Sequence, residues 1–247
     1  MNRTMLSAAV VCLVGAILCG GALADPMSRE QGEAVINELR QIRLLLEKQQ
    51  KQAPPAQPSQ PEKVRLQLGR EYSLGKDDAP LVMLEYTDYQ CPFCNRFTTT
   101  TFPELKKLYI DTGKLRFISR DFPLEFHPHA MKAAEAVRCA GDQEKFWVMK
   151  ESLMTNSAKL TPELITALAR EAGLDMEKFT GCMESGRHLA GIRERMAAAT
   201  SVGINGTPTF VVGMVKGDYL EGYKIIGAQP FAAFDGLLKE LLARGGQ

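Results

Sequence analysis

The chain opens with a long apolar run that has charged or small residues at both ends. Met5 to Leu18 is almost wholly apolar, Arg3 precedes it, and Ala22-Leu23-Ala24 follows with the small-x-small spacing that signal peptidase requires. This pattern predicts a signal peptide over residues 1–24 that is cleaved after Ala24. We therefore expect an exported, periplasmic protein.

Two other interpretations of this leader are weaker. The apolar run is short for a membrane anchor, and no basic stop-transfer flank follows it. A lipoprotein attached through Cys19 is disfavoured by Leu18, because the residue before a lipidated cysteine is normally small.

Residues 28–50 have the pattern of one amphipathic helix. Val35, Leu39, Ile42 and Leu46 recur at 4-3-4 spacing, which is a heptad seam, among good helix formers. Ser28 and Gln31 are spaced for a capping box at its start. An apolar seam of this kind has to be buried against another surface. We therefore expect residues 25–51 to form an oligomerisation helix and the protein to be a homo-oligomer. Docking on the chain's own following domain is the alternative.

Residues 52–62 form a proline-rich linker. Four prolines among these eleven residues favour extended polyproline II and exclude helix, with a reach of roughly 30–35 Å at about 3.1 Å per residue. The helix is thereby separated from the next domain, which argues against docking.

Residues 63–247 alternate between strand-like and helix-like patterns. Leu81–Thr87 is a short apolar run typical of a buried strand, a helical stretch from Pro92 to about Asp111 follows, and Leu115–Arg120 alternates like a second strand. A helical insertion occupies about 127–201. Further strands are predicted at Val64–Leu68, Thr209–Val212 and Leu220–Ile226, and a closing helix at Pro230–Leu242. The pattern predicts an α/β domain with a helical segment inserted in its middle.

Charge and cysteine content narrow the function. The formal charge is +1, and loss of Arg3 with the signal peptide brings it to zero, so neither nucleic acid nor an anionic membrane surface is an expected partner. Four cysteines remain after residue 24, which allow three pairings in an oxidising compartment. They are Cys91, Cys94, Cys139 and Cys182.

Cys91-Pro92-Phe93-Cys94 is a C-x-x-C motif, which indicates either zinc or redox chemistry. Zinc needs four ligands, and none of the three histidines lies at a finger-like spacing from Cys91. Cys91 follows a predicted strand and directly precedes a helix, where free N–H groups and the helix dipole lower a thiol pKa. Redox chemistry with no metal and no cofactor is therefore expected.

Two distant motifs give the chain a family resemblance. Leu84-Glu85-Tyr86-Thr87-Asp88-Tyr89-Gln90 before the C-x-x-C motif, and Gly206-Thr207-Pro208-Thr209 before a later strand, resemble the DsbA family of the thioredoxin-like superfamily. Arg138-Cys139-Ala140-Gly141 is similar to its inserted helical domain. The resemblance covers roughly residues 75–245 and implies a thioredoxin-like fold and thiol–disulfide oxidoreductase activity.

The resemblance assigns roles to the motif residues. Cys91 corresponds to the attacking, more exposed cysteine and Cys94 to the buried resolving one. Pro92 and Phe93 form the active-site dipeptide, and the lack of a cation at Phe93 indicates a milder oxidant than the family's strongest members. Glu85 corresponds to a buried acid that relays the Cys94 proton, although a carboxylate at the sheet edge without that role is the alternative.

Two further pairs of residues are singled out, the first by the resemblance and the second by its place in the chain. Thr207 and Pro208 correspond to the cis-proline loop, which faces the active disulfide and binds an extended substrate strand. Cys139 and Cys182 both fall in the helical insertion, away from the reactive pair, and are expected to form a structural disulfide. Two separate buried thiols are the alternative.

For the direction of the reaction, the sequence favours isomerase or reductase activity, with a dithiol oxidase as the alternative. The oligomerisation helix and Thr207 are typical of isomerases or reductases, whereas the helical insertion is typical of oxidases kept oxidised by a membrane redox partner. Client proteins with cysteines are the expected substrates in both cases. A non-catalytic chaperone or binding module on the same fold is the alternative from another class.

Overall fold

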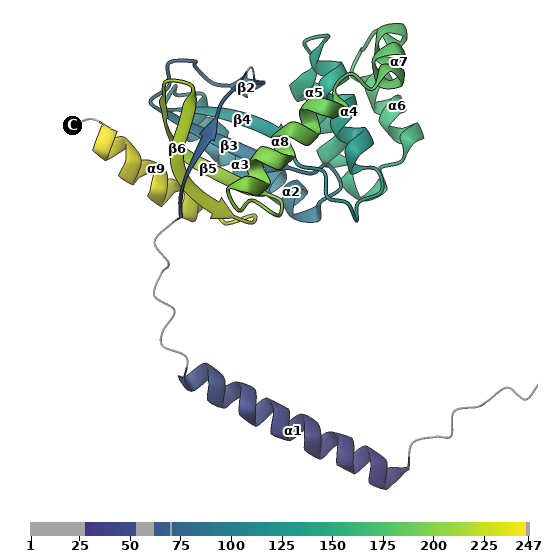
Figure 1. Ribbon diagram of the computed structural model, residues 1–247, viewed down its shortest axis with the longest axis vertical. Helices are drawn as coiled ribbons and strands as arrows, with labels where there is room; N and C mark the ends of the chain where they lie inside the picture. Colours follow the sequence, from purple (N-terminus) through teal and green to yellow (C-terminus); the bar gives the residue numbers. More distant parts are fainter. Residues whose placement is uncertain (1–27, 53–61, 70, 246–247) are drawn as a thin grey trace, which may run out of the picture. The chain divides into compact units, whose positions relative to one another are not determined.

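The computed structural model describes residues 28–52, 62–69 and 71–245, with side chains described outside 49–52. The predicted signal peptide and most of the predicted linker lie outside these residues. The chain divides into two units between residues 58 and 59, a boundary inside the predicted linker. Figure 1 shows the helix of the first unit and the sheet and helices of the second. No helix in the described ranges is both long and apolar enough to cross a membrane.

The first unit contains helix α1 (Arg29–Gln52), close to the predicted range. Its start is a capping box: the Ser28 amide donates to Oε1 of Gln31 at 2.9 Å, and the Gln31 amide donates to Oγ of Ser28 at 3.2 Å. This prediction is confirmed. The seam side chains and their flanking neighbours are between 48% and 63% exposed, namely Val35, Ile36, Leu39, Ile42, Leu45 and Leu46.

In the described part of the second unit, six strands form one mixed sheet in the order β1-β6-β5-β3-β4-β2. The neighbouring strands β3 and β4 are parallel, and the other neighbours are antiparallel. Their bounds are β1 Lys63–Gln67, β2 Ser73–Leu74, β3 Leu81–Thr87, β4 Leu115–Asp121, β5 Thr209–Lys216 and β6 Tyr219–Ile226. All seven residues of β3 are buried, which explains its uninterrupted apolar sequence.

Alternate residues of β3 serve two different cores. Leu81 and Met83 pack with Phe97, Phe117 and Phe210 on one face of the sheet. The other face holds a second cluster, which includes Val82, Leu84, Tyr86, Ile118, Val211 and Ala199. Helix α9 (Phe231–Gly245) covers the first face through Phe234, Leu238 and Leu241. Because side chains alternate between the two faces along a strand, Glu85 lies on the same face as Met83.

The predicted helix from Pro92 to about Asp111 is present but not regular. It consists of α2 (Pro92–Arg96), a π-helical turn over Phe97–Thr101, α3 (Phe102–Leu105) and a second π-helical turn over Lys106–Ile110. Pro103 lies at its centre and has no N–H, so a regular i→i−4 ladder cannot run through this point.

The inserted segment forms a helical subdomain with its own core. Its elements are α4 (Ala130–Gly141), α5 (Phe146–Thr155), a 3-10 turn over Ser157–Lys159, α6 (Pro162–Glu171), α7 (Met176–Ser185) and α8 (Leu189–Ser201). Figure 1 shows α4 to α7 grouped beside one end of the sheet. Tyr89, Cys91 and Cys94 belong to the core cluster of this subdomain. The fold is the expected thioredoxin-like α/β sheet with a helical insertion.

Candidate active site

Cys91 lies where strand β3 passes into helix α2. The intervening turn is held by Asp88, whose Oδ1 accepts from the Gln90 amide at 2.7 Å and whose carbonyl accepts from the Cys91 amide at 3.2 Å. Cys91 is the N-cap residue with extended backbone, and Pro92 occupies the first helical position. Since proline has no N–H to leave unpaired, it suits that position, and the backbone N–H groups that follow are free to face the Cys91 sulfur.

Both cysteines of the motif are free thiols and both are buried. Cys91 is 3% exposed and Cys94 is 0% exposed, so the expected difference in accessibility is small. Phe93, between them, is 53% exposed. Cys91 therefore lies just below the surface, beside an apolar ring that faces solvent.

The surroundings of Cys91 favour its thiolate. The hydrogen bond from the Cys94 thiol is the largest cause, and the Thr207 side chain and the backbone of Cys94 and Phe93 add to it in the same direction. The buried Thr207 hydroxyl has no hydrogen-bond partner of normal geometry within the described residues, which leaves it free to donate to the thiolate. Burial acts in the opposite direction, and the net result lowers the Cys91 pKa to about 6. At neutral pH the sulfur is mainly the thiolate, which is the nucleophilic form.

Cys94 has the opposite environment. Burial is the largest cause that raises its pKa well above the ordinary value, and the Cys91 hydrogen bond, the Cys91 charge and the Glu85 charge raise it further. The motif therefore holds one ionised thiol and one protonated thiol that donates to it.

The pairing of β5 with β3 places Thr207 and Pro208 beside the reactive pair. Strand β5 runs antiparallel to β3 with Thr209 opposite Tyr86, so the residues before β5 and after β3 meet at the same end. The Thr207–Pro208 peptide bond is cis. The carbonyl oxygen of Thr207 lies 3.4 Å from Sγ of Cys91. The structure thus brings together the two motifs that the sequence separates by more than a hundred residues.

Glu85 lies on β3 and is fully buried. Its Oε2 accepts from Nζ of Lys150 at 2.8 Å and from Oγ of Ser119 at 3.2 Å, whereas its Oε1 has no hydrogen-bond partner within the described chain. Glu85 and Lys150 also line a cavity of about 360 Å³ whose other walls are largely apolar. The pair is therefore a buried ion pair at the wall of a partly open, largely apolar pocket.

Lys150 was not singled out by sequence reasoning, although a signal was present. Helix α5 buries Phe146, Met149, Leu153 and Met154. Lys150 lies at the same helical spacing as these residues, so it falls on the buried stripe and needs a charged partner.

A second polar network joins the helical insertion to the sheet beneath the site. Asp121, at the end of β4, accepts from the Tyr89 hydroxyl at 2.9 Å and from Nε of Arg138 on α4. Asp88 accepts in addition from the Leu124 amide at 2.7 Å, and its Oδ2 lies 2.8 Å from Nδ1 of His127. These bonds fix the loop before Cys91 from both sides.

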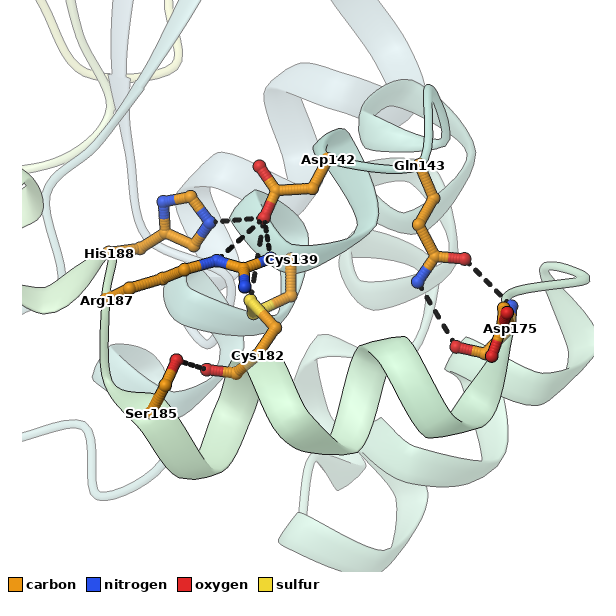
Figure 2. Close-up of a disulfide and its surroundings, with 8 residues drawn as sticks. All are labelled: Cys139, Asp142, Gln143, Asp175, Cys182, Ser185, Arg187 and His188. Carbon is orange, nitrogen blue, oxygen red and sulfur yellow. Dashed lines mark hydrogen bonds and ion pairs between the residues drawn. A yellow bond between two sulfur atoms is a disulfide. The ribbon is translucent and has the colours of Figure 1, made fainter.

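Cys139 on α4 and Cys182 on α7 are joined by a disulfide, as the sequence led us to expect. Figure 2 shows it beside a polar group made of Asp142, Arg187 and His188. It cross-links α4 and α7 through two cysteines that are 43 positions apart in sequence. These cysteines belong to the same core cluster as Cys91 and Cys94.

A family model described as thioredoxin matches residues 67–239. Among solved structures, the α-DsbA1 of Wolbachia pipientis is similar with a TM-score of 0.66 and 26% identity, over 73% of this chain and 94% of that one. Oxidised BdbD from Bacillus subtilis has a TM-score of 0.63 at 24% identity, over 74% and 99% of the two chains. The catalytic domain of Proteus mirabilis ScsC has a TM-score of 0.57 at 24% identity, over 70% and 89%. The last two similarities concern the fold.

Curated relatives match in one part of much longer proteins. The Na(+)/H(+) antiporter NhaA 1 of Salinispora arenicola is 33% identical over 144 residues, which are 58% of this chain and 22% of the antiporter. The NhaA 1 of Mycolicibacterium vanbaalenii is 35% identical over 150 residues, which are 60% of this chain and 24% of that protein. The chain therefore spans about a quarter or less of the length of these relatives.

Proposed function

The chain belongs to the thioredoxin family, among its DsbA-related thiol–disulfide oxidoreductases, and on that premise we propose that Cys91 and Cys94 exchange disulfides with client proteins. The observation that carries this proposal is the pairing of a Cys91 thiol of pKa about 6 with a Cys94 thiol whose pKa is raised.

In the first step the Cys91 thiolate attacks one sulfur of a client disulfide. The client S–S bond breaks, one client sulfur leaves as a thiolate, and the other forms a mixed disulfide with Cys91. Phe93 offers an exposed apolar ring next to the attacking cysteine, and the Thr207–Pro208 loop lies within 3.4 Å of its sulfur for contact with an extended client segment.

In the second step Cys94 gives up its proton and attacks Sγ of Cys91. The mixed disulfide breaks, the second client sulfur leaves as a thiolate, and the Cys91–Cys94 disulfide closes. The client gains two electrons, and the enzyme dithiol loses them. We assign Glu85 as the proton acceptor because its charge acts on Cys94 and it adjoins a cavity. The reverse sequence oxidises a client dithiol.

We favour the isomerase or reductase direction over the oxidase direction. A pKa of about 6 for Cys91 lies between the value of about 3.5 for a strongly oxidising DsbA and about 7 for thioredoxin. Because thiolate stabilisation favours the reduced form, this less acidic thiol makes a weaker oxidant than that DsbA, which agrees with the isomerase or reductase direction.

The exposed seam of α1 supports a homo-oligomer formed through residues 28–50. Several domains held together raise the effective concentration of a second active site around one client, which favours reshuffling. Export through the leader at residues 1–24 places this assembly in the periplasm, where a membrane redox partner sets the state of the Cys91–Cys94 pair.

Reduction of insulin by the full-length protein in the presence of a dithiol tests the proposed activity. We expect turnover by the natural chain and none by Cys91→Ser. Equal rates for both would reject the proposed chemistry. Absence of turnover together with binding of unfolded protein would indicate the alternative, a chaperone or binding module. Thiol trapping in cells then separates the directions, since an isomerase keeps Cys91 and Cys94 reduced and an oxidase keeps them oxidised.

A further inference from the structure

The disulfide between Cys139 and Cys182 lies at the centre of a cluster of metal-ligating side chains. Its two sulfur atoms and a ring nitrogen of His188 lie within 4.8 Å of one another. Oδ2 of Asp142 lies 2.8 Å from Nε2 of His188 and 3.7 Å from Sγ of Cys182. Figure 2 shows these side chains converging from α4, α7 and the turn before α8.

The backbone explains why His188 returns to the disulfide. Helix α7 ends at Gly186, which adopts a left-handed conformation with φ of 61°. This C-cap turns the chain back directly after α7, the helix that carries Cys182. The turn brings Arg187 and His188 close to the disulfide sulfur atoms. A side chain at Gly186 would be strained in this conformation, so the turn depends on glycine.

The donor set matches one metal best. Two thiolates, one imidazole and one carboxylate are ligands of tetrahedral zinc, with bonds of about 2.0–2.3 Å. Donors around such an ion lie roughly 3.3–3.8 Å apart. The 3.7 Å between Oδ2 of Asp142 and Sγ of Cys182 falls in this range, whereas the 2.8 Å between Oδ2 of Asp142 and Nε2 of His188 is a hydrogen bond that has to lengthen to admit the ion. Arg187 donates to Oδ2 of Asp142, and its positive charge offsets the single negative charge that a zinc ion would leave on this set.

The cluster of metal-ligating side chains is also open to solvent and has a second carboxylate nearby. Cys139, Asp142, Cys182 and Arg187 line an open cavity of about 520 Å³, so a metal ion and a small reductant can approach buried sulfurs from this side. Glu135 on α4 is 6% exposed, and its Oε1 has no partner within the described residues. That oxygen lies 3.9 Å from the Cβ position of Gly186, which places a second carboxylate beside the turn that carries His188.

We propose that Cys139, Cys182, His188 and Asp142 bind Zn²⁺ when the disulfide is reduced, so that a disulfide and a zinc ion are alternative cross-links between α4 and α7. A dithiol reductant supplies two electrons and two protons: the Cys139–Cys182 bond breaks, two thiols form, and the reductant closes to its own disulfide. Zn²⁺ then replaces the two thiol protons, which are released to solvent. A disulfide of small molecules reverses the sequence: it accepts the two electrons of the thiolates and two protons from solvent to become a dithiol, the Cys139–Cys182 bond forms, and Zn²⁺ is released.

The test uses the full-length chain with Cys91→Ser and Cys94→Ser, so that the reactive pair cannot bind metal. One sample is left oxidised, and a second is reduced with a phosphine, which is itself converted to the phosphine oxide. Both samples are then incubated anaerobically with zinc chloride and desalted. We expect one zinc per reduced chain by mass spectrometry and none per oxidised chain. Cobalt in place of zinc should give the absorption bands of a tetrahedral thiolate site.

Matched variants locate the site. His188→Ala and Asp142→Asn should each weaken zinc binding about tenfold or more, while His129→Ala, a histidine whose side chain makes no cap hydrogen bond, should leave it unchanged. Thermal unfolding of each reduced variant establishes that it folds, and zinc should raise the Tm of the reduced parent but not that of His188→Ala. A reduced parent that binds no zinc, or equal binding after His188→Ala and Asp142→Asn, would overturn the proposal.

Discussion

Sγ of Cys91 lies 3.4 Å from the carbonyl oxygen of Thr207, a residue 116 positions further along the chain. The contact exists because β3 and β5 are adjacent and antiparallel, with the end of one beside the start of the other. It joins the nucleophile to the loop that we assign to client binding, so a change at Thr207 is expected to act on the sulfur directly.

The first prediction concerns pH. Because Cys91 has a pKa of about 6 and the Cys94 pKa is raised, reduction of the Cys91–Cys94 disulfide takes up two protons below pH 6 and one proton above it. The reduction potential should therefore fall by about 59 mV per pH unit below pH 6 and by about 30 mV per pH unit above it. Equilibration with glutathione buffers from pH 4 to pH 8 measures both slopes. A slope of about 59 mV per pH unit across this whole range would show that the Cys91 pKa is not lowered.

The second prediction concerns the hydroxyl of Thr207. The Thr207 side chain contributes to the lowered Cys91 pKa, and its hydroxyl has no other hydrogen-bond partner within the described residues, so Thr207→Val, which keeps the shape and removes the hydroxyl, should raise that pKa. Thr207→Ser keeps the hydroxyl and should leave the pKa near 6. Thiolate absorbance during a pH titration of each reduced variant gives the values. An equal pKa in Thr207→Val and the natural chain would exclude this contribution.

The third prediction concerns the buried pair of Glu85 and Lys150. Lys150→Met leaves the Glu85 carboxylate buried without its cation and should lower the free energy of unfolding by about 3–5 kcal/mol. The double variant Lys150→Met with Glu85→Gln should lose less free energy of unfolding than the two single variants together. In the double variant no buried charge is left without its partner.

Urea unfolding of the oxidised proteins measures this cycle. Lys159→Met is the control, because Lys159 is exposed and its loss should change the free energy of unfolding by no more than about 0.5 kcal/mol. Additive losses in the double variant would show that Glu85 and Lys150 are not coupled.

The fourth prediction concerns the seam of α1. Leu39→Glu puts a charge in the apolar seam and should yield a monomer, whereas Leu44→Glu lies outside the seam and should leave the oligomer intact. Deletion of residues 25–51 should also give a monomer that still reduces insulin but reactivates scrambled ribonuclease poorly. Light scattering and the two assays test this. A natural chain that is already monomeric, or a truncated chain with full isomerase activity, would contradict it.

Much of the fold could be predicted from local patterns. Strand β3 was predicted at its observed bounds because a fully buried strand has a continuous apolar sequence that ends at Pro80 and Asp88. The capping box of α1 was predictable for the same local reason. Strand β2 has two residues, Ser73 and Leu74, and a segment of that length carries no periodic signal.

The site was less predictable where it depends on distant partners. The motif around Cys91 and the Thr207–Pro208 loop were found through their family pattern, yet the burial of Cys91 depends on how the loop packs against it. The partner of Glu85 is Lys150, 65 residues away on a helix of the insertion. No spacing rule joins those two positions, so only the tertiary structure shows the ion pair.

Capture of the reaction intermediate tests the central claim most directly. Cys94→Ala cannot resolve a mixed disulfide, so incubation with a scrambled disulfide protein, followed by thiol blocking, proteolysis and mass spectrometry, should recover client peptides joined to Cys91. Cys91→Ala should recover none. Client peptides joined mainly to Cys94, Cys139 or Cys182, or equal capture by both variants, would contradict Cys91 as the nucleophile.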